Sequence, residues 1–241
     1  MKKTALIVLL VSISISVFTQ PMDGNYTIGK NDNDFMSINE AINALETNGI
    51  SAPIYFFIEN GTYEEQIIIP EIAGTSTDNT ICFQSESGNK TDVIIEYAST
   101  QSDATYTLKL DSTKNIQFKN LTLKTKCVLY DNTLVELNNS ENISFNKCQL
   151  IGSIKESNNF IYTKYLIISK EEVVNAHNLS LENNDFINSN YGIKLEGKSH
   201  GNQTKNLAIN KNIFKNIIWY CKLPIFRTVV YYNVTKIFLF P

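Results

Sequence analysis

A short pattern recurs four times along the chain and limits what the chain can fold into. Each copy begins with Asn and has large apolar residues at its second, fourth and ninth positions, and copies follow one another after roughly 27 to 36 residues. The alternation of apolar and polar residues predicts strands with one buried face. A series of such strands predicts an all-β fold, a right-handed parallel β-helix (solenoid).

The repeated Asn residues precede the strands, where a short amide side chain tolerates left-handed backbone and bonds to turns. If the coils stack, these residues form a structural Asn ladder: Asn115, Asn142, Asn178 and Asn206. Asn139 lies outside this column, and we expect its replacement to cost almost nothing. The apolar positions predict interior rows, namely Ile116, Ile143, Leu179 and Leu207; Phe118, Phe145, Leu181 and Ile209; and Leu123, Leu150, Phe186 and Phe214.

Residues 1–20 have the composition of a secretory signal peptide. Lys2 and Lys3 provide the basic start, and an apolar, Ser-rich core from Thr4 to Phe18 follows them. This core is short for a membrane-spanning helix, which needs roughly 20 apolar residues. We therefore expect a secreted or cell-surface protein that does not span a membrane after signal removal. An uncleaved membrane anchor is the alternative.

Charge and cysteine content exclude several kinds of site. Without Lys2 and Lys3, 19 basic residues (21 minus 2) face 24 acidic ones, so a nucleic-acid partner is not expected. With two His residues and no Cys-x-x-Cys pair, neither a metal site nor another cofactor is expected. Export permits disulfides, but buried thiols are equally compatible with the four cysteines, which are Cys82, Cys127, Cys148 and Cys221.

The β-helix domain is predicted to span residues 21–216, with one helix near 34–48. Apolar residues from Phe35 to Leu45 recur at helical spacing, Asn33 or Asp34 can cap the start, and Gly49 can end the helix. We expect this helix to cover the open first end of the solenoid. Insertions at 155–175 and 196–205 are expected to project as loops on one side, where binding sites usually lie.

Residues 217–241 form an atypical tail. They contain clustered apolar aromatic residues and no Asn in register with the ladder. A terminal strand pair is one interpretation, and a truncated or non-native segment is the other.

The segment from Asp34 to Pro70 resembles the N-terminal part of pectin methylesterases, in the pectin-lyase-like superfamily. The resemblance rests on Phe35, Ile38, Ala41 and Ile42, on the apolar run Ile54–Ile58, and on Gly61, Tyr63 and Glu65. Residues 24–216 also resemble the opening of large secreted bacterial β-helix surface proteins. The resemblance implies the fold, and it implies a polysaccharide as a possible partner.

Candidate catalytic residues have structural explanations. Glu64 and Glu65 follow Tyr63 in a segment that a tight turn with a core Tyr explains. Asp185 resembles the catalytic Asp of the pectin methylesterase Asp-Phe-Ile motif, but Phe186 lies in a repeat column, which makes Asp185 a turn residue. Arg227, the only arginine, lies in the tail. Ester or lyase chemistry on a uronate needs a prepared cationic site, and no complete set is present, so we assign no catalytic residue.

We therefore interpret the chain as an exported, non-catalytic β-helix module, a surface or glycan-binding segment of a larger protein. The alternatives are a carbohydrate-active enzyme of the pectin esterase or polysaccharide lyase type, and a purely structural or adhesive rod. A cluster of acids with a nearby Lys would favour the enzyme. A row of exposed aromatics would favour glycan binding.

Overall fold

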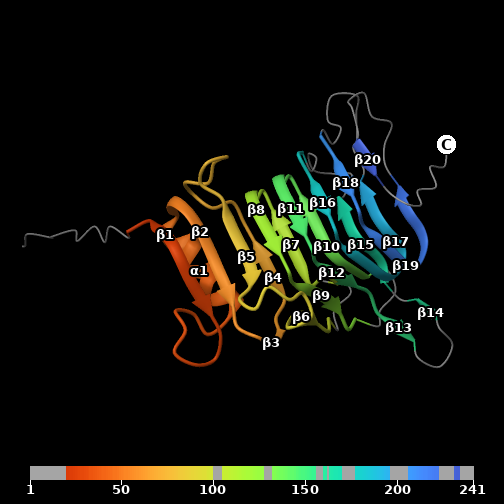
Figure 1. Ribbon diagram of the computed structural model, residues 1–241, viewed down its shortest axis with the longest axis horizontal. Coiled ribbons are helices and arrows are strands. Elements are labelled where there is room, and N and C mark those ends of the chain that lie inside the picture. The colour runs from red at the N-terminus through yellow and green to blue at the C-terminus, as the bar shows by residue number, and fades with distance from the viewer. Residues whose placement is uncertain are drawn as a thin grey trace, which may run out of the picture.

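A computed structural model shows an elongated stack of β-coils (Figure 1). It describes residues 20–99, 105–127, 132–155, 160–161, 163–169, 177–195, 206–222 and 231–233. The predicted signal peptide lies almost wholly outside these residues, as do Arg227, His200 and all of residues 196–205. The segment 155–175 is not simply the projecting loop expected from the sequence, because Thr163–Ser169 forms a strand that pairs with the neighbouring coils. In the part of the chain that is described, no helix has the length and apolar character needed to cross a membrane.

The strands form three faces, and the pairing between coils is parallel throughout. Face 1 consists of β1 (Met22–Ile28), β2 (Ile50–Ile58), β5 (Ile81–Ser85), β8 (Lys114–Lys119), β11 (Glu141–Asn146), β16 (Ser180–Glu182), β18 (Ala208–Asn210) and β20 (Tyr231–Asn233). Face 2 consists of β3 (Gly61–Glu64), β6 (Val93–Tyr97), β9 (Thr122–Thr125), β12 (Gln149–Ile151) and the first halves of β17 (Asp185–Leu195) and β19 (Ile213–Lys222). Face 3 consists of β4 (Ile67–Ile69), β7 (Leu108–Asp111), β10 (Asn132–Asn138), β15 (Thr163–Ser169) and the second halves of β17 and β19. The parallel β-helix predicted from the repeats is confirmed.

A short antiparallel hairpin, β13 (Ile154–Lys155) with β14 (Phe160–Ile161), branches off after β12. Strand β19 continues past residue 216, where the sequence suggested the end of the domain. It pairs with β17 without a register shift, from Phe214 opposite Phe186 to Lys222 opposite Lys194. Strand β20 pairs with β18. Parts of the tail at 217–222 and 231–233 therefore continue the stacked strands.

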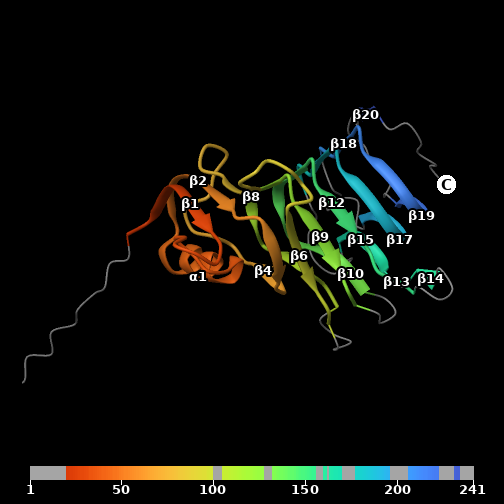
Figure 2. The same ribbon diagram turned by 60° about the horizontal axis from the view of Figure 1, so that its bottom comes forward.

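Helix α1 (Ile38–Asn48) lies at the first end of the stack, beside β1 and β4 (Figure 2). It ends at Gly49, as predicted, because Gly49 adopts a φ of 66° and donates its backbone N–H to the Leu45 carbonyl. It starts at Ile38 rather than at Asp34. The Asp34 carboxylate accepts hydrogen bonds from the backbone N–H and hydroxyl of Thr27, at 2.7 and 2.9 Å, so that Asp34 is bound to β1. Ser37 caps the helix instead, accepting the backbone N–H of Glu40.

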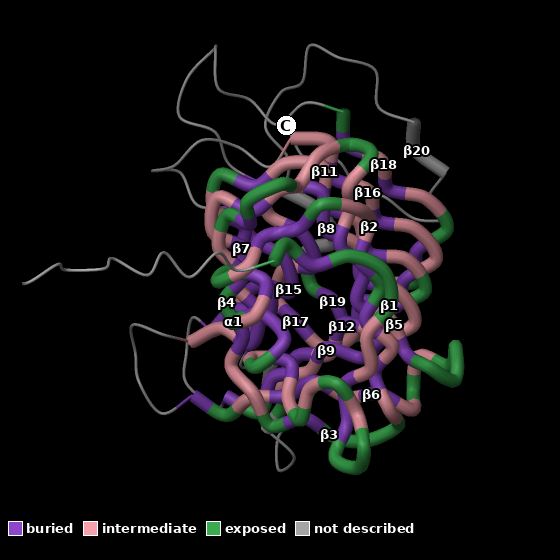
Figure 3. The backbone as a smooth tube through the Cα atoms, turned by 90° about the vertical axis from the view of Figure 1, so that its left-hand side faces the viewer, coloured by how far each residue is buried: buried purple, intermediate pink, exposed green. Residues whose placement is uncertain are grey.

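The interior rows stack as the repeat pattern predicts. Phe118, Phe145, Leu181 and Ile209 occupy partner positions on successive strands, and each is buried. The row extends toward the first end through Phe83 and Phe56, and the four phenylalanine rings stack with centroids 4.8 to 5.8 Å apart. The row of Leu123, Leu150, Phe186 and Phe214 is likewise in register. Buried residues therefore fill the inside of the coil along its length (Figure 3).

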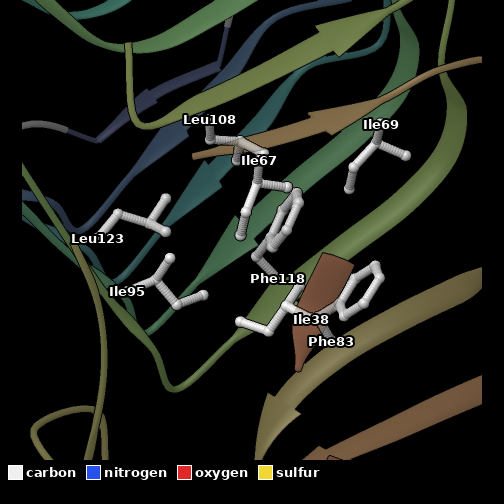
Figure 4. A pocket seen from close by; sticks show the side chains of 8 residues that line it. All are labelled: Ile38, Ile67, Ile69, Phe83, Ile95, Leu108, Phe118 and Leu123. Carbon is white, nitrogen blue, oxygen red and sulfur yellow. The ribbon is translucent and has the colours of Figure 1, made fainter. Parts of the chain in front are cut away.

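Under the capping helix the core leaves a cavity of only about 10 Å³. Figure 4 shows the eight apolar side chains that surround it, with Ile38 of α1 near Phe83 and Phe118. A space of this size holds at most one water, and its lining offers that water no hydrogen-bond partner. The described core at this end of the solenoid is therefore packed, with no room for a ligand under the helix.

Candidate binding groove

A polar groove of about 240 Å³ runs over face 1. Its floor comes from β8, β11 and β16, and its wall comes from the connection between β4 and β5. The lining residues are Thr77, Thr80, Asn115, Gln117, Asn142, Ile143, Ser144, Asn178 and Ser180. All but Ile143 are uncharged hydrogen-bonding residues, so the groove offers donors and acceptors but no formal charge.

The floor arises directly from the repeat. Gln117 lies opposite Ser144 in the β8–β11 pair, and Ser144 lies opposite Ser180 in the β11–β16 pair. Each occupies the third position of its repeat, between two buried apolar residues, so it points outward. This polar column was not predicted, although the third position of the repeat is polar in each of these three copies and could have been read from the sequence.

The ladder asparagines form one edge of the groove. Asn142 donates from Nδ2 to Oδ1 of Asn115 at 2.8 Å, Asn178 donates to Asn142 at 2.6 Å, and Asn206 donates to Asn178 at 2.7 Å. All four have a φ between 53° and 59°, in the left-handed region that Asn tolerates better than most residues. The side chains are therefore fixed both by their backbone and by one another.

Face 2 carries a different site around Asp185, which begins β17 and faces outward. It is therefore a strand residue rather than the turn residue expected from the sequence. Its carboxylate accepts hydrogen bonds from Lys90 Nζ at 2.8 Å and from Gln149 Nε2 at 3.2 Å, and its side chain is 11% exposed. Burial acts to raise the pKa of Asp185, but the Lys90 and Gln149 hydrogen bonds outweigh it, and the pKa is lowered. Asp185 is thus an ionised, paired carboxylate.

A second charged cluster lies farther toward the first end of face 2. Glu96 is buried between Lys124, whose Nζ is 3.3 Å away, and Lys126, which also contacts Glu64 at 3.0 Å. Burial acts to raise the pKa of Glu96, but the two lysines lower it. A space of about 220 Å³ lies beside Glu96 and Lys126. The lowered pKa keeps Glu96 ionised at neutral pH, so Glu96 does not serve as a protonated acid there.

Glu65 is structural, in a way that the sequence did not show. Its carboxylate accepts the backbone N–H groups of Ile38 and Asn39, at 3.1 and 2.9 Å, at the start of α1. A negative charge at a helix N-terminus is stabilising. Glu64 is exposed, Tyr63 is buried, and Gly61–Glu64 forms strand β3 rather than a tight turn.

Cys82, Cys127 and Cys148 are free buried thiols, and the side chain of Cys221 lies outside the described part of the chain. Within the described residues, no three His, Cys, Asp or Glu side chains come together as metal ligands would.

Comparisons with known proteins return likenesses of fold. No protein-family profile and no curated protein sequence matches the chain. Among solved structures, a pectin methylesterase from Aspergillus niger aligns with 14% identity and a TM-score of 0.47, over 84% of this chain and 76% of that one. The Escherichia coli protein ybhc aligns with 12% identity and a TM-score of 0.48, over 88% and 75%. Pectin methylesterase PemA from Erwinia chrysanthemi aligns with 13% identity and a TM-score of 0.43, over 78% and 70%. No residue role is carried over from these structures.

Proposed function

We propose that the chain is an exported, non-catalytic β-helix module that binds polysaccharide on its outer surface, as a segment of a larger protein. The observation that carries the proposal is the uncharged polar groove on face 1. Sugar hydroxyl groups both donate and accept hydrogen bonds, and the Asn, Gln, Ser and Thr side chains of the groove can do the same. Because adjacent strands repeat at about 4.8 Å, stacked coils present equivalent groups at regular intervals to a repeating polymer.

The location of the groove also fits an extended ligand. Its floor crosses three successive strands of one sheet, so the binding surface follows the long axis of the solenoid. Binding sites on solenoid proteins are commonly extended surfaces of this type. A purely structural rod would not need a hollowed surface lined by hydrogen-bonding side chains.

The alternative, a carbohydrate-active enzyme, draws support from Asp185. An ionised carboxylate next to Gln149 and Lys90 has the elements of a base or nucleophile site. However, among the described residues, the charged groups that shift the pKa of Asp185 are Lys90 and Lys215, and neither is a carboxyl that could act as a partner acid.

The grouping of Glu64 and Glu96 with Lys126 is the kind of acid cluster that an enzyme would show, and the groove lining contains no aromatic side chain. The preference for binding therefore rests on the uncharged hydrogen-bonding groove alone.

The proposal is tested with the purified mature chain by affinity electrophoresis in gels that contain single polysaccharides. A panel of neutral and acidic plant and bacterial polymers would be used, with a protein of similar charge as the mobility reference. We expect retardation by at least one polymer. Unchanged mobility in every gel would contradict the proposal.

A further inference from the structure

We propose that the groove on face 1 is selective for neutral polysaccharides and holds them along the axis of the solenoid, over Gln117, Ser144 and Ser180. This inference rests on the proposed function, and it specifies the ligand class and its contacts. Its starting point is the lining, which contains no charged side chain. A carboxylate or sulfate group in this groove would lose water without gaining a cationic partner, and that loss is unfavourable.

Charged side chains are instead paired with one another on face 2. Lys90 is paired with Asp185, and both Lys124 and Lys126 are paired with Glu96. Lys124 lies in β9, and Lys90 and Lys126 lie in the connections next to β6 and β9. The strands of the groove also carry charged residues, such as Lys114, which is 3.9 Å from Glu71, but these lie outside the groove lining.

The ladder makes the edge of the groove suited to recognition. Each Asn amide has two N–H donors and a carbonyl oxygen that can accept twice. Within the described chain, Asn142 uses one donor toward Asn115 and one acceptor position toward Asn178. On Asn142, and likewise on Asn178, one N–H and one acceptor position remain for a ligand. Because the ladder already fixes the side chains, binding costs little further side-chain entropy.

The floor of the groove indicates how a bound polymer is oriented. Gln117, Ser144 and Ser180 lie at successive partner positions, so the distance from the first to the third is about two strand spacings, or roughly 10 Å. A polymer lying along the axis meets all three side chains and the adjacent ladder amides in sequence. A polymer lying parallel to the strands would meet only one coil. The repeat therefore favours the axial orientation.

The test uses the full mature chain with galactomannan and xyloglucan as neutral probes and polygalacturonate and alginate as acidic probes. The blocking variant is Ser144→Phe, which places a large ring on the floor of the groove. Its matched control is Thr62→Phe, an exposed strand position on face 2. A second variant, Gln117→Ala with Ser180→Ala, removes hydrogen-bonding groups without adding bulk. Thermal unfolding establishes that each variant is folded.

We expect a neutral polymer to retard the wild-type chain, with affinity reduced roughly tenfold or more in Ser144→Phe and in the double variant, and unchanged in Thr62→Phe. Oligosaccharides of the retained polymer should bind more tightly with length until they span the three floor residues. Retention by acidic polymers only, or retention unaffected by both groove variants, would overturn this inference and leave the proposed function standing. Absence of retention by every polymer would instead overturn the proposed function.

Discussion

The Asn142 side chain donates a hydrogen bond from Nδ2 to Oδ1 of Asn115, 2.8 Å away on the preceding coil. The same bond links Asn178 to Asn142 and Asn206 to Asn178, so one amide type joins four coils in a row. The ladder thus holds the turns between face 3 and face 1 in register, and it forms the edge of the binding groove. The same side chains therefore join the coils and line the proposed binding surface.

The contribution of the ladder hydrogen bonds to the free energy of unfolding can be separated from that of the left-handed backbone. Asn142 and Asn120 both have left-handed φ angles, 56° and 53°, but Asn120 lies in a different turn. Glycine tolerates this backbone, so Asn142→Gly and Asn120→Gly alter it equally little. We expect Asn142→Gly to lower the free energy of unfolding by on the order of 1 kcal/mol more than Asn120→Gly, because two ladder bonds are lost. Urea unfolding followed by circular dichroism measures both, and equal losses would remove the ladder as a source of stability.

Asn139 is not the neutral control that the sequence suggested. It has a φ of 46°, so an alanine there would carry the left-handed backbone cost of roughly 1–2 kcal/mol. The backbone angle and a long contact of 3.5 Å from Asn139 Nδ2 to Ser112 Oγ distinguish this position from an ordinary exposed Asn, and the sequence reveals neither.

The buried aromatic row should dominate the stability of the middle coils. Phe145 is fully buried and stacks on Phe118, whereas Ser144 beside it points into the groove. We expect Phe145→Ser to cost roughly 3–5 kcal/mol or more, the range for truncating a buried Phe. Ser144→Ala should remain within about 0.5 kcal/mol, as is usual for surface changes. Similar unfolding midpoints for the two variants would contradict the assignment of the two sides of β11.

A second set of asparagines lies inside the turns between face 1 and face 2. Asn184 is fully buried, accepts the backbone N–H of Cys148 at 2.8 Å and donates to the Phe145 carbonyl at 2.9 Å. One coil later, Asn212 accepts the backbone N–H of Asn184 and donates to the Leu181 carbonyl. Asn184→Leu would leave two buried backbone groups unpaired, at roughly 1–3 kcal/mol for each.

We therefore expect Asn184→Leu to be strongly destabilising. The control is Asn183→Gly, because Asn183 is the neighbouring left-handed residue and glycine keeps its backbone. Chemical denaturation of the two variants provides the comparison. A leucine variant as stable as the control would show that the buried amide contributes nothing.

The acid sensitivity of the fold should depend on Asp185. Its pKa is lowered in the folded chain, so the stability it contributes is fully present above its unfolded pKa of about 3.9 and is lost as pH falls through the lower folded value. Asp185→Asn should therefore be less stable than wild type at pH 7, and the difference should shrink as pH falls below about 4. Denaturation curves from pH 7 to pH 2.5 give this difference directly. A constant difference across that range would mean that the Lys90 pair does not titrate with unfolding.

The sequence predicted the features of this fold that depend on a local repeat, and it did not predict those that depend on contacts between distant residues. The rows that contain Ile116 and Phe145 were visible because burial on one face of a strand imposes a period of two. The start of α1 was misplaced because Ser37 and Asp34 are both good caps, and only contact with Thr27 decides between them. The Lys90–Asp185 pair joins residues 95 positions apart, and no local pattern encodes it.

The groove could be predicted from the sequence in part only. Its floor residue Ser144 occupies a fixed position in the repeat, so its outward direction could have been read from the sequence. The wall from Thr77 and Thr80 could not, because a connection between strands has no period that specifies its path. The polar column was predictable, and the groove formed beside it was not.

The final prediction is that the mature chain releases neither methanol from pectin nor unsaturated products from polygalacturonate or alginate. Asp185 is ionised and held by Lys90 and Gln149, so a substrate would have to displace a lysine from a side chain that is 11% exposed. Glu96 is similarly held between two lysines. General acid catalysis needs a carboxyl that remains protonated near the working pH, and the lowered pKa values of Asp185 and Glu96 have the opposite effect. Methanol assays and absorbance of unsaturated uronates measure both reactions. Methanol release that disappears in Asp185→Ala but persists in Glu64→Ala would show that the charged face is an active site and that binding on face 1 is at most one of two functions.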